Sequence, residues 1–139
     1  MSLITKSKSM KNLSLVLVFV IAIISLGCKN EVDGEIKLVS TEEMQSILKM
    51  DEVQLVDVRT PEEFSEGYIE DAQNIDFKSP TFEQDILKLD KDKPVMLYCH
   101  SGRRSAACAQ KLKDAGFKKI YDLEGGISQW KHEGLVIKQ

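Results

Sequence analysis

The chain has 139 residues, 42% of them apolar, with 19 basic and 22 acidic side chains and a formal net charge of −3. Its length accommodates one domain, and its composition excludes a disordered chain, a collagen-like repeat and a disulfide-held scaffold, because three cysteines cannot staple a protein of this size. The slightly acidic balance also argues against a nucleic-acid partner, which requires a basic surface.

The first 27 residues differ in composition from the rest. They contain three lysines, no acidic residue and an almost unbroken apolar run at 13–24. A positive start, a short apolar stretch and a small residue before a processing point are typical of a secretory signal, and the run is shorter than the roughly 20 residues of a spanning helix. With Cys28 directly after Gly27, the segment resembles a bacterial lipoprotein signal peptide, although Ser25 stands where leucine is usual.

The resemblance implies that residues 1–27 are removed and that Cys28 is lipidated and becomes the mature N-terminus. Residues 28–35 are polar and aperiodic, which predicts a tether between the lipid and the domain. Several acyl chains would hold the protein firmly, since a single chain binds membranes only marginally. The alternative is an uncleaved N-terminal anchor. Both interpretations place the domain in an extracytoplasmic space, facing the periplasm or the surface of a bacterial envelope.

From residue 36 onward, strand and helix patterns alternate. Apolar stretches predict strands at 36–39, 53–58, 72–77, 94–98 and 119–123, and the stretch at 53–58 is rich in β-branched residues. Apolar residues at helical spacing predict helices after Ser40, after Thr60, and at 81–89, 105–115 and 126–132. Capping boxes, with Glu43 three residues after Ser40 and Glu63 three residues after Thr60, mark the first two helices. The alternation predicts an α/β domain over residues 36–139, with a five-stranded, mostly parallel sheet and helices on both faces.

The candidate chemistry lies in one loop, residues 99–104 (CHSGRR). The loop connects a buried strand to a helix at the carboxyl end of the predicted sheet, where open α/β folds bind ligands. Its backbone N–H groups and the positive end of the helix that begins near Ser105 can form a cradle for an anion, with Cys99 at its base.

The side chains around Cys99 support a reactive thiol. His100, Arg103 and Arg104 should lower the pKa of Cys99 from about 8.5 and keep it largely thiolate near neutral pH. Gly102 permits a tight turn with positive φ. The alternative is a buried structural cysteine, since free cysteines are often buried.

Three segments, in matching order and spacing, carry a resemblance to a known family. They are 55–64 (LVDVRTPEEF), 98–107 (YCHSGRRSAA) and 123–130 (LEGGISQW). With these motifs, residues 36–137 resemble a single rhodanese domain along nearly their whole length. The chain departs from the family at 67–72, where GYIEDA stands in place of the frequent Gly-His-Ile-Pro-Gly-Ala, and we expect this to alter local geometry more than activity.

The resemblance implies a sulfurtransferase. A sulfane sulfur would move from a donor such as thiosulfate to Cys99, forming a persulfide, and then to cyanide or a thiol. The residues implied to bind the substrate and stabilise the persulfide are His100, Ser101, Gly102, Arg103 and Arg104. Arg104 would brace the loop, and Arg103 is the better candidate for attracting an anionic donor. Asp57 and Arg59 either orient the site or form an ion pair that braces the strand end.

Two alternatives remain open. Phosphatase and arsenate reductase loops read Cys-x5-Arg, whereas Arg104 here follows Cys99 by five positions, and this smaller ring suits a single sulfur atom better than phosphate. A membrane-tethered persulfide carrier or sensing module would share the same persulfide. We expect Cys108 to be a packed core residue rather than a resolving thiol. We also expect no metal, no cofactor, no nucleic acid and a monomer.

Overall fold

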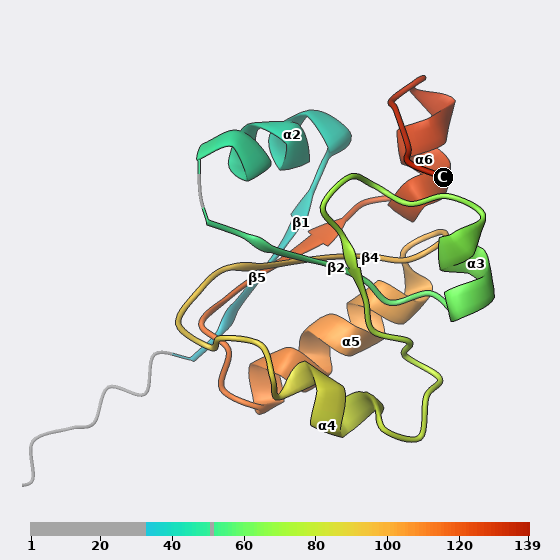
Figure 1. Ribbon diagram of the computed structural model, residues 1–139. Helices are drawn as coiled ribbons and strands as arrows, with labels where there is room; N and C mark the ends of the chain where they lie inside the picture. The colour runs from blue at the N-terminus through green and yellow to red at the C-terminus, as the bar shows by residue number, and fades with distance from the viewer. Residues whose placement is uncertain (1–32, 51) are drawn as a thin grey trace, which may run out of the picture. The chain divides into compact units, whose positions relative to one another are not determined.

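The structure is a computed structural model that describes residues 33–50 and 52–139 (Figure 1). The predicted signal peptide, Cys28 and most of the predicted tether lie outside these residues, so those assignments stay predictions. Among the residues that the structure describes, no helix is both long enough and apolar enough to cross a membrane.

The described chain forms a sheet of five strands in the order β1-β5-β4-β2-β3. These strands are β1 (Glu35–Val39), β2 (Gln54–Asp57), β3 (Gln73–Asn74), β4 (Val95–Tyr98) and β5 (Lys119–Leu123). Every pairing between them is parallel. The central strand β4 is buried along its whole length, as expected for a strand with helices on both of its faces. The predicted five-stranded sheet is therefore confirmed.

Helices cover both faces of this sheet. They are α2 (Thr41–Met50), α3 (Pro61–Ser65), α4 (Phe82–Ile86), α5 (Arg103–Asp114) and α6 (Gly126–His132). In Figure 1, α2 and α6 lie above the sheet and α4 and α5 lie below it. This arrangement confirms the predicted α/β class with two helical layers.

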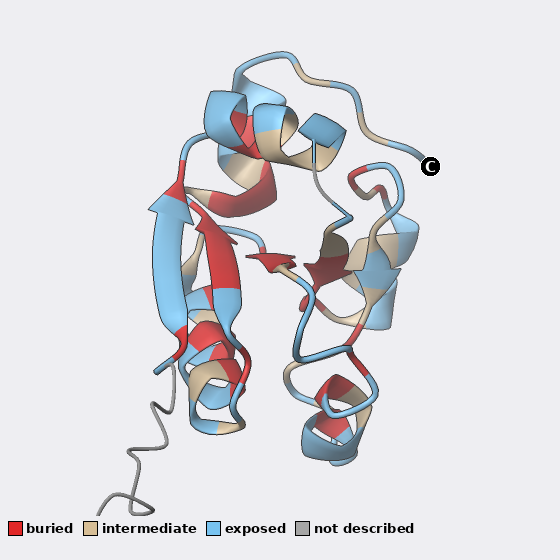
Figure 2. Cartoon of the chain, turned by 90° about the vertical axis from the view of Figure 1, so that its left-hand side faces the viewer, coloured by how far each residue is buried: buried red, intermediate tan, exposed pale blue. Residues whose placement is uncertain are grey.

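Alternation along β4 divides the core into two clusters. Val95, Leu97 and Cys99 join the cluster packed against α4 and α5. Met96 and Tyr98 join the cluster packed against α2 and α6. Figure 2 shows the same sheet from the side, with a buried β5 beside the largely exposed edge strand β1. Because side chains alternate along a strand, Cys99 lies on the side of the sheet that α5 covers.

Both predicted capping boxes are present. The Ser40 hydroxyl accepts from the Glu43 N–H at 3.2 Å, and the Glu43 carboxylate accepts from the Ser40 N–H at 3.0 Å. Thr60 and Glu63 form the same reciprocal pair at the start of α3, with proline at the first helical position.

Several predicted boundaries were wrong. The strand predicted at 72–77 is reduced to β3, because the chain turns after it and Asp76 accepts a hydrogen bond from the Lys78 N–H at 2.8 Å. The helix predicted at 81–89 covers only α4. The helix predicted from Ser105 begins two residues earlier, so Arg103 and Arg104 lie in the first turn of α5.

The end of the predicted tether belongs to the domain. Glu35 is the first residue of β1, and its N–H donates to the Lys118 carbonyl at 3.0 Å. Gly34 is buried so tightly that a Cβ at this position would lie 2.1 Å from the Phe117 carbonyl oxygen. Asp33 forms an ion pair with Lys113 at 3.3 Å. Residues 33–35 are therefore held by the domain, which corrects the predicted tether end at residue 35.

Candidate active site

Cys99 lies directly after β4, at the carboxyl end of the sheet, and is 1% exposed. The loop that follows folds back over its sulfur. The Gly102 N–H donates to the Cys99 Sγ at 3.0 Å, and the Ser105 hydroxyl donates to the same sulfur at 3.5 Å. Two hydrogen-bond donors therefore contact the sulfur, an arrangement that stabilises an anion.

Helix α6 sets the direction of the loop peptides. The Cys99 carbonyl accepts from the Ile127 N–H at 2.9 Å, and the His100 carbonyl accepts from the Ser128 N–H at 3.0 Å. In a planar trans peptide, the N–H points opposite to the C=O. With both carbonyls turned toward α6, the next two N–H groups point away from α6, and one of them, that of Ser101, helps to lower the pKa of Cys99.

Two glycines shape the loop, Gly126 by permitting the close approach of α6 and Gly102 by its backbone angle. Gly126 has a φ of +60°, and a Cβ there would lie 2.5 Å from the Cys99 carbonyl oxygen. Gly102 has a φ of +105° and ends the loop immediately before α5. A Cβ on Gly102 would meet only the Gly125 nitrogen, at 3.8 Å, so its backbone angle rather than crowding requires glycine there.

The pKa of the Cys99 thiol is lowered. Burial has the largest single effect and raises it, but hydrogen bonds together outweigh burial. These come from the hydroxyl and the N–H of Ser105 and from the N–H groups of Gly102 and Ser101. The sequence predicted a lowered pKa from positive side chains, whereas hydrogen bonds have the larger effect in the structure. A hydrogen-bonded thiolate is the form that acts as a nucleophile.

Ser105 is a site residue that the sequence analysis missed. It was assigned only to the start of a helix, yet its hydroxyl reaches both the Cys99 Sγ and, at 3.2 Å, the Gly102 carbonyl. The signal was available in its position, since the first turn of a helix places a side chain back over the preceding loop.

Arg104 ties the loop to α3. Its guanidinium donates to both carboxylate oxygens of Glu63, at 2.7 and 2.8 Å. The Glu63 carboxylate also accepts a hydrogen bond from the Thr60 N–H in the capping box at the start of α3. The Arg104 guanidinium, with help from Thr60, lowers the pKa of Glu63 to about 2. This geometry fits the predicted bracing role of Arg104, and it adds Glu63 to the site.

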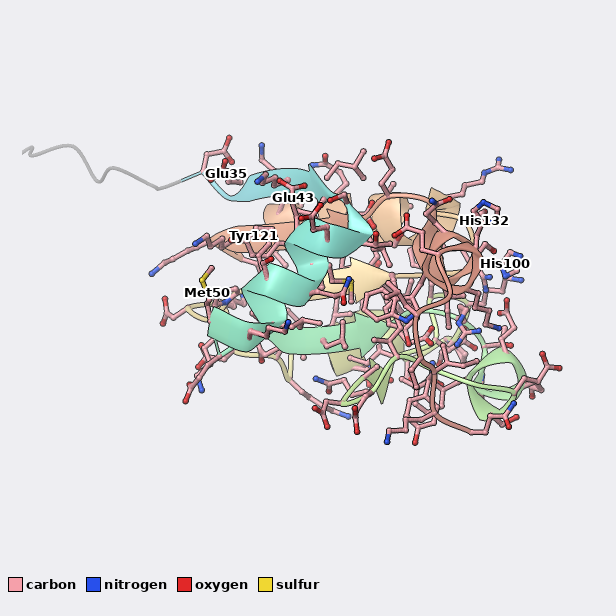
Figure 3. All side chains as sticks on the ribbon, turned by 90° about the horizontal axis from the view of Figure 1, so that it is seen from above. Glu35, Glu43, Met50, His100, Tyr121 and His132 are labelled. Carbon is pink, nitrogen blue, oxygen red and sulfur yellow. The ribbon has the colours of Figure 1, made fainter. Side chains whose placement is uncertain are left out.

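The outer side of the loop carries exposed polar residues. Ser101 and Arg103 are exposed, and the His100 Nε2 lies 3.2 Å from the Ser128 hydroxyl of α6. Figure 3 shows His100 and His132 at the same end of the molecule, beside α6. Arg103 therefore places an exposed positive charge in the first turn of α5, beside the loop that holds Cys99.

Asp57 and Arg59 form a buried ion pair at the end of β2. They are 0% and 3% exposed, and the Arg59 Nη2 lies 2.6 Å from the Asp57 Oδ2. Arg59 also donates to the Gly67 carbonyl at 2.7 Å. The pair therefore holds the segment that departs from the family pattern, which agrees with the alternative that it braces the strand end.

Cys108, a residue of α5, is fully buried in the core cluster that includes residues of α4 and α5. Burial, together with the negative charges of Asp122 and Cys99, raises the pKa of Cys108 to about 12. A neutral, buried thiol of this kind is unreactive, which fits a packed core residue better than a resolving thiol.

Comparisons with known proteins assign the chain to a family. The family model described as a rhodanese-like domain matches residues 40–133. The chain is 34% identical over 95 residues to the thiosulfate sulfurtransferase GlpE of Coxiella burnetii, covering 68% of this chain and 87% of the relative. It is 33% identical over 108 residues to a sulfurtransferase of Allochromatium vinosum, covering 78% and 94%. A match to the uncharacterized protein YqhL of Bacillus subtilis is 43% identical but spans 55% of this chain and only 60% of that protein.

Solved structures show the same fold. The crystal structure of a rhodanese-like domain protein from Staphylococcus aureus is 35% identical, with a TM-score of 0.63, and the alignment covers 74% of this chain and 99% of that one. A polysulfide-sulfur transferase homodimer from Wolinella succinogenes is 28% identical, with a TM-score of 0.63 and coverage of 77% and 81%. Sequence and structure agree over most of the described domain, and the chain belongs to the rhodanese-like domain family.

Proposed function

We propose that the protein is a sulfurtransferase that carries sulfur as a persulfide on Cys99. The observation that carries the proposal is the pair of hydrogen-bond donors on one buried sulfur atom: the Gly102 N–H at 3.0 Å and the Ser105 hydroxyl at 3.5 Å. The names of the relatives from Coxiella burnetii and Allochromatium vinosum support the same reaction class.

The first half-reaction loads the cysteine. The Cys99 thiolate attacks the sulfane sulfur of thiosulfate, a new S–S bond forms, and the bond to the sulfonate sulfur breaks. Sulfite leaves with the electron pair of that bond, and the negative charge remains on the outer sulfur of the persulfide. Loop N–H groups that already point inward stabilise this charge without reorganising during the reaction.

The second half-reaction removes the outer sulfur from Cys99. Cyanide attacks the outer sulfur, the S–S bond breaks, thiocyanate departs and the Cys99 thiolate returns. A thiolate acceptor would react in the same way and leave as a persulfide. The enzyme alternates between two covalent states, so ping-pong kinetics are expected. No change in net proton number is needed in either step.

The two arginines have different roles in this proposal. Arg104 is held by Glu63 through two hydrogen bonds and is committed to fixing the loop. Arg103 is exposed in the first turn of α5, where its charge can attract an anionic donor. We expect His100, at the rim, to contact the acceptor.

Steady-state kinetics with thiosulfate and cyanide test the proposal. Varying both substrates should give parallel double-reciprocal lines, and Cys99→Ser should abolish thiocyanate formation while Cys108→Ser retains it. Hydrolysis of a phosphate ester by the wild type, without sulfur transfer, would instead support the phosphatase alternative. Persulfide formation with negligible turnover on small acceptors would support a carrier or sensing module.

The location of the protein is a separate proposal that the sequence alone supports. We propose that Cys28 is lipidated and tethers the domain to a membrane on its extracytoplasmic side. The domain would then meet small sulfur compounds and thiols outside the cytoplasm.

A further inference from the structure

The exposed part of the Cys99 loop carries one side chain that can accept a proton. His100, Ser101 and Arg103 are the exposed residues of this loop. A guanidinium only donates hydrogen bonds, and a serine hydroxyl is not a base at neutral pH, whereas imidazole is the side chain that most often acts as a general base. The two proposed half-reactions give His100 only a contact with the acceptor, so its basic nitrogens are without a role.

The carboxylates beside the loop are already engaged by arginines. Arg104 donates to both carboxylate oxygens of Glu63, at 2.7 and 2.8 Å, and this contact chiefly lowers the pKa of Glu63 to about 2. The fully buried Asp57 places its Oδ2 2.6 Å from the Arg59 Nη2. A carboxylate held in this way is a poor proton acceptor. Among the described residues of the site, His100 is therefore the base available to a molecule that approaches from solvent.

Helix α6 holds His100 at two points through a single residue. The Ser128 N–H donates to the His100 carbonyl at 3.0 Å, and the Ser128 hydroxyl oxygen lies 3.2 Å from the His100 Nε2. The main chain beneath is equally constrained, because a Cβ on Gly126 would lie 2.6 Å from the His100 carbonyl oxygen. Figure 3 shows His100 at the end of the molecule where α6 lies. With Nε2 engaged, Nδ1 is the ring nitrogen left to meet another molecule.

Thiol acceptors need such a base. The nucleophile in sulfur transfer is the thiolate, and an ordinary thiol, with a pKa of about 8.5, is mostly protonated at neutral pH. A thiol that reaches the persulfide must therefore lose its proton before or during its attack. An acceptor that arrives already ionised has no proton to lose. Dependence on a base thus distinguishes a protonated thiol from an ionised acceptor.

We propose that the acceptor is a protonated thiol, that His100 is its general base, and that Ser128 is a positioning residue that holds the imidazole. The inference rests on the proposed function, because it requires a persulfide on Cys99. The Nε2–H donates to the Ser128 hydroxyl, so Nδ1 carries no proton and takes the proton of the thiol. The new thiolate forms a bond to the outer sulfur, and the bond from that sulfur to Cys99 breaks with its electron pair left on Cys99. The product leaves as a persulfide anion, and the imidazolium returns its proton to water.

The test compares two neutral small thiols that differ in acidity. Each protein is first loaded with thiosulfate, and intact mass confirms the added sulfur before the thiol is mixed in. Near pH 8, 2-mercaptoethanol is mostly protonated, whereas trifluoroethanethiol is mostly ionised. His100→Ala should slow transfer to 2-mercaptoethanol by about tenfold or more and transfer to trifluoroethanethiol by less than about threefold, because only the first has a proton to lose. Equal slowing with both thiols would overturn the base.

Variants of Ser128 decide whether it acts through His100. Ser128→Ala should slow transfer to 2-mercaptoethanol by about threefold, and Ser128→Thr, which keeps the hydroxyl, should restore the wild-type rate. In the His100→Ala background, Ser128→Ala should change the rate by less than about 1.5-fold. A full effect in that background would overturn the positioning role. His132→Ala removes an exposed imidazole at the end of α6 and, as the matched control, should leave both rates unchanged.

The loading step separates this inference from the proposed function. A wild type that never gains sulfur would overturn both, whereas normal loading with thiol transfer that is indifferent to His100 would overturn the inference alone. If alanine at position 100 prevents folding, His100→Gln keeps a planar polar side chain without a basic nitrogen and should show the same selective loss with 2-mercaptoethanol. A parallel experiment with reduced serum albumin shows whether the thiol belongs to a protein or a small molecule, and dependence on His100 with either supports the proposal.

Discussion

Replacing Arg104 with alanine tests the brace between the Cys99 loop and α3. The Glu63 pKa falls from 4.5 to about 2, chiefly through the hydrogen bonds from Arg104. At 1.36 kcal/mol per pKa unit, a shift of this size corresponds to at most about 3 kcal/mol. The Glu63 side chain is 32% exposed, and Thr60 contributes part of the shift, so solvent screening and the remaining cap reduce the figure. We expect Arg104→Ala to lower the free energy of unfolding by about 1 to 2 kcal/mol at neutral pH.

The pH dependence gives this prediction its sharper form. A carboxyl whose pKa is depressed in the folded protein contributes stability above its unfolded pKa and loses it as the pH falls toward the folded pKa. The stability difference between wild type and Arg104→Ala should therefore be complete above pH 4.5 and shrink as the pH falls to about 2. Urea unfolding at a series of pH values measures it. A difference that is the same at every pH would refute the ion-pair reasoning.

Arg103→Ala is the matched control, because Arg103 is the exposed neighbour in the same helical turn. The free energy of unfolding of Arg103→Ala should remain within about 0.5 kcal/mol of the wild-type value.

The two variants should also differ in their kinetics. Arg103→Ala should chiefly slow the reaction with thiosulfate, whereas Arg104→Ala should slow both half-reactions and raise the Cys99 pKa. Equal losses in both half-reactions for Arg103→Ala, with Arg104→Ala near wild type, would mean that the two roles are reversed.

Three further predictions concern other parts of the chain. Gly126→Ala should cost about 3 kcal/mol or more and abolish sulfur loading, because its Cβ would lie 2.5 Å from the Cys99 carbonyl oxygen. Gly134→Ala, at a φ of +74° with nothing within 4 Å, should cost only about 1 to 2 kcal/mol and retain loading; equal costs in thermal unfolding would contradict the crowding argument. Asp57→Asn leaves a buried arginine without its counter-charge and should cost about 3 kcal/mol in urea unfolding, so wild-type stability would refute the brace at β2. Cys28→Ala should block labelled fatty-acid incorporation and leave the signal attached; absence of label from the wild type would exclude a lipoprotein.

Local patterns in the sequence were sufficient to predict most of the helices and strands. Capping boxes located the starts of α2 and α3, and the apolar runs located β2, β4 and β5. They overestimated β3 and α4, because apolar residues there pack against the core from irregular backbone rather than from regular elements. A hydrophobic pattern reports burial, and burial does not require a strand or a helix.

The candidate site was predictable only where its residues are neighbours in the chain. The loop motif identified Cys99 and its cradle, whereas Glu63 reaches Arg104 across 41 residues. The contact of α6 with the Cys99 and His100 carbonyls likewise joins two separate motifs. Such contacts depend on the order of strands in the sheet, which no local pattern specifies.

Intact-mass analysis of the purified protein tests the central claim most directly. After incubation with thiosulfate, the wild type should gain the mass of one sulfur atom and lose it again on addition of cyanide. Cys108→Ser should behave in the same way, and Cys99→Ser should gain nothing. A wild type that gains no sulfur, or a Cys99→Ser variant that still gains it, would contradict a persulfide on Cys99.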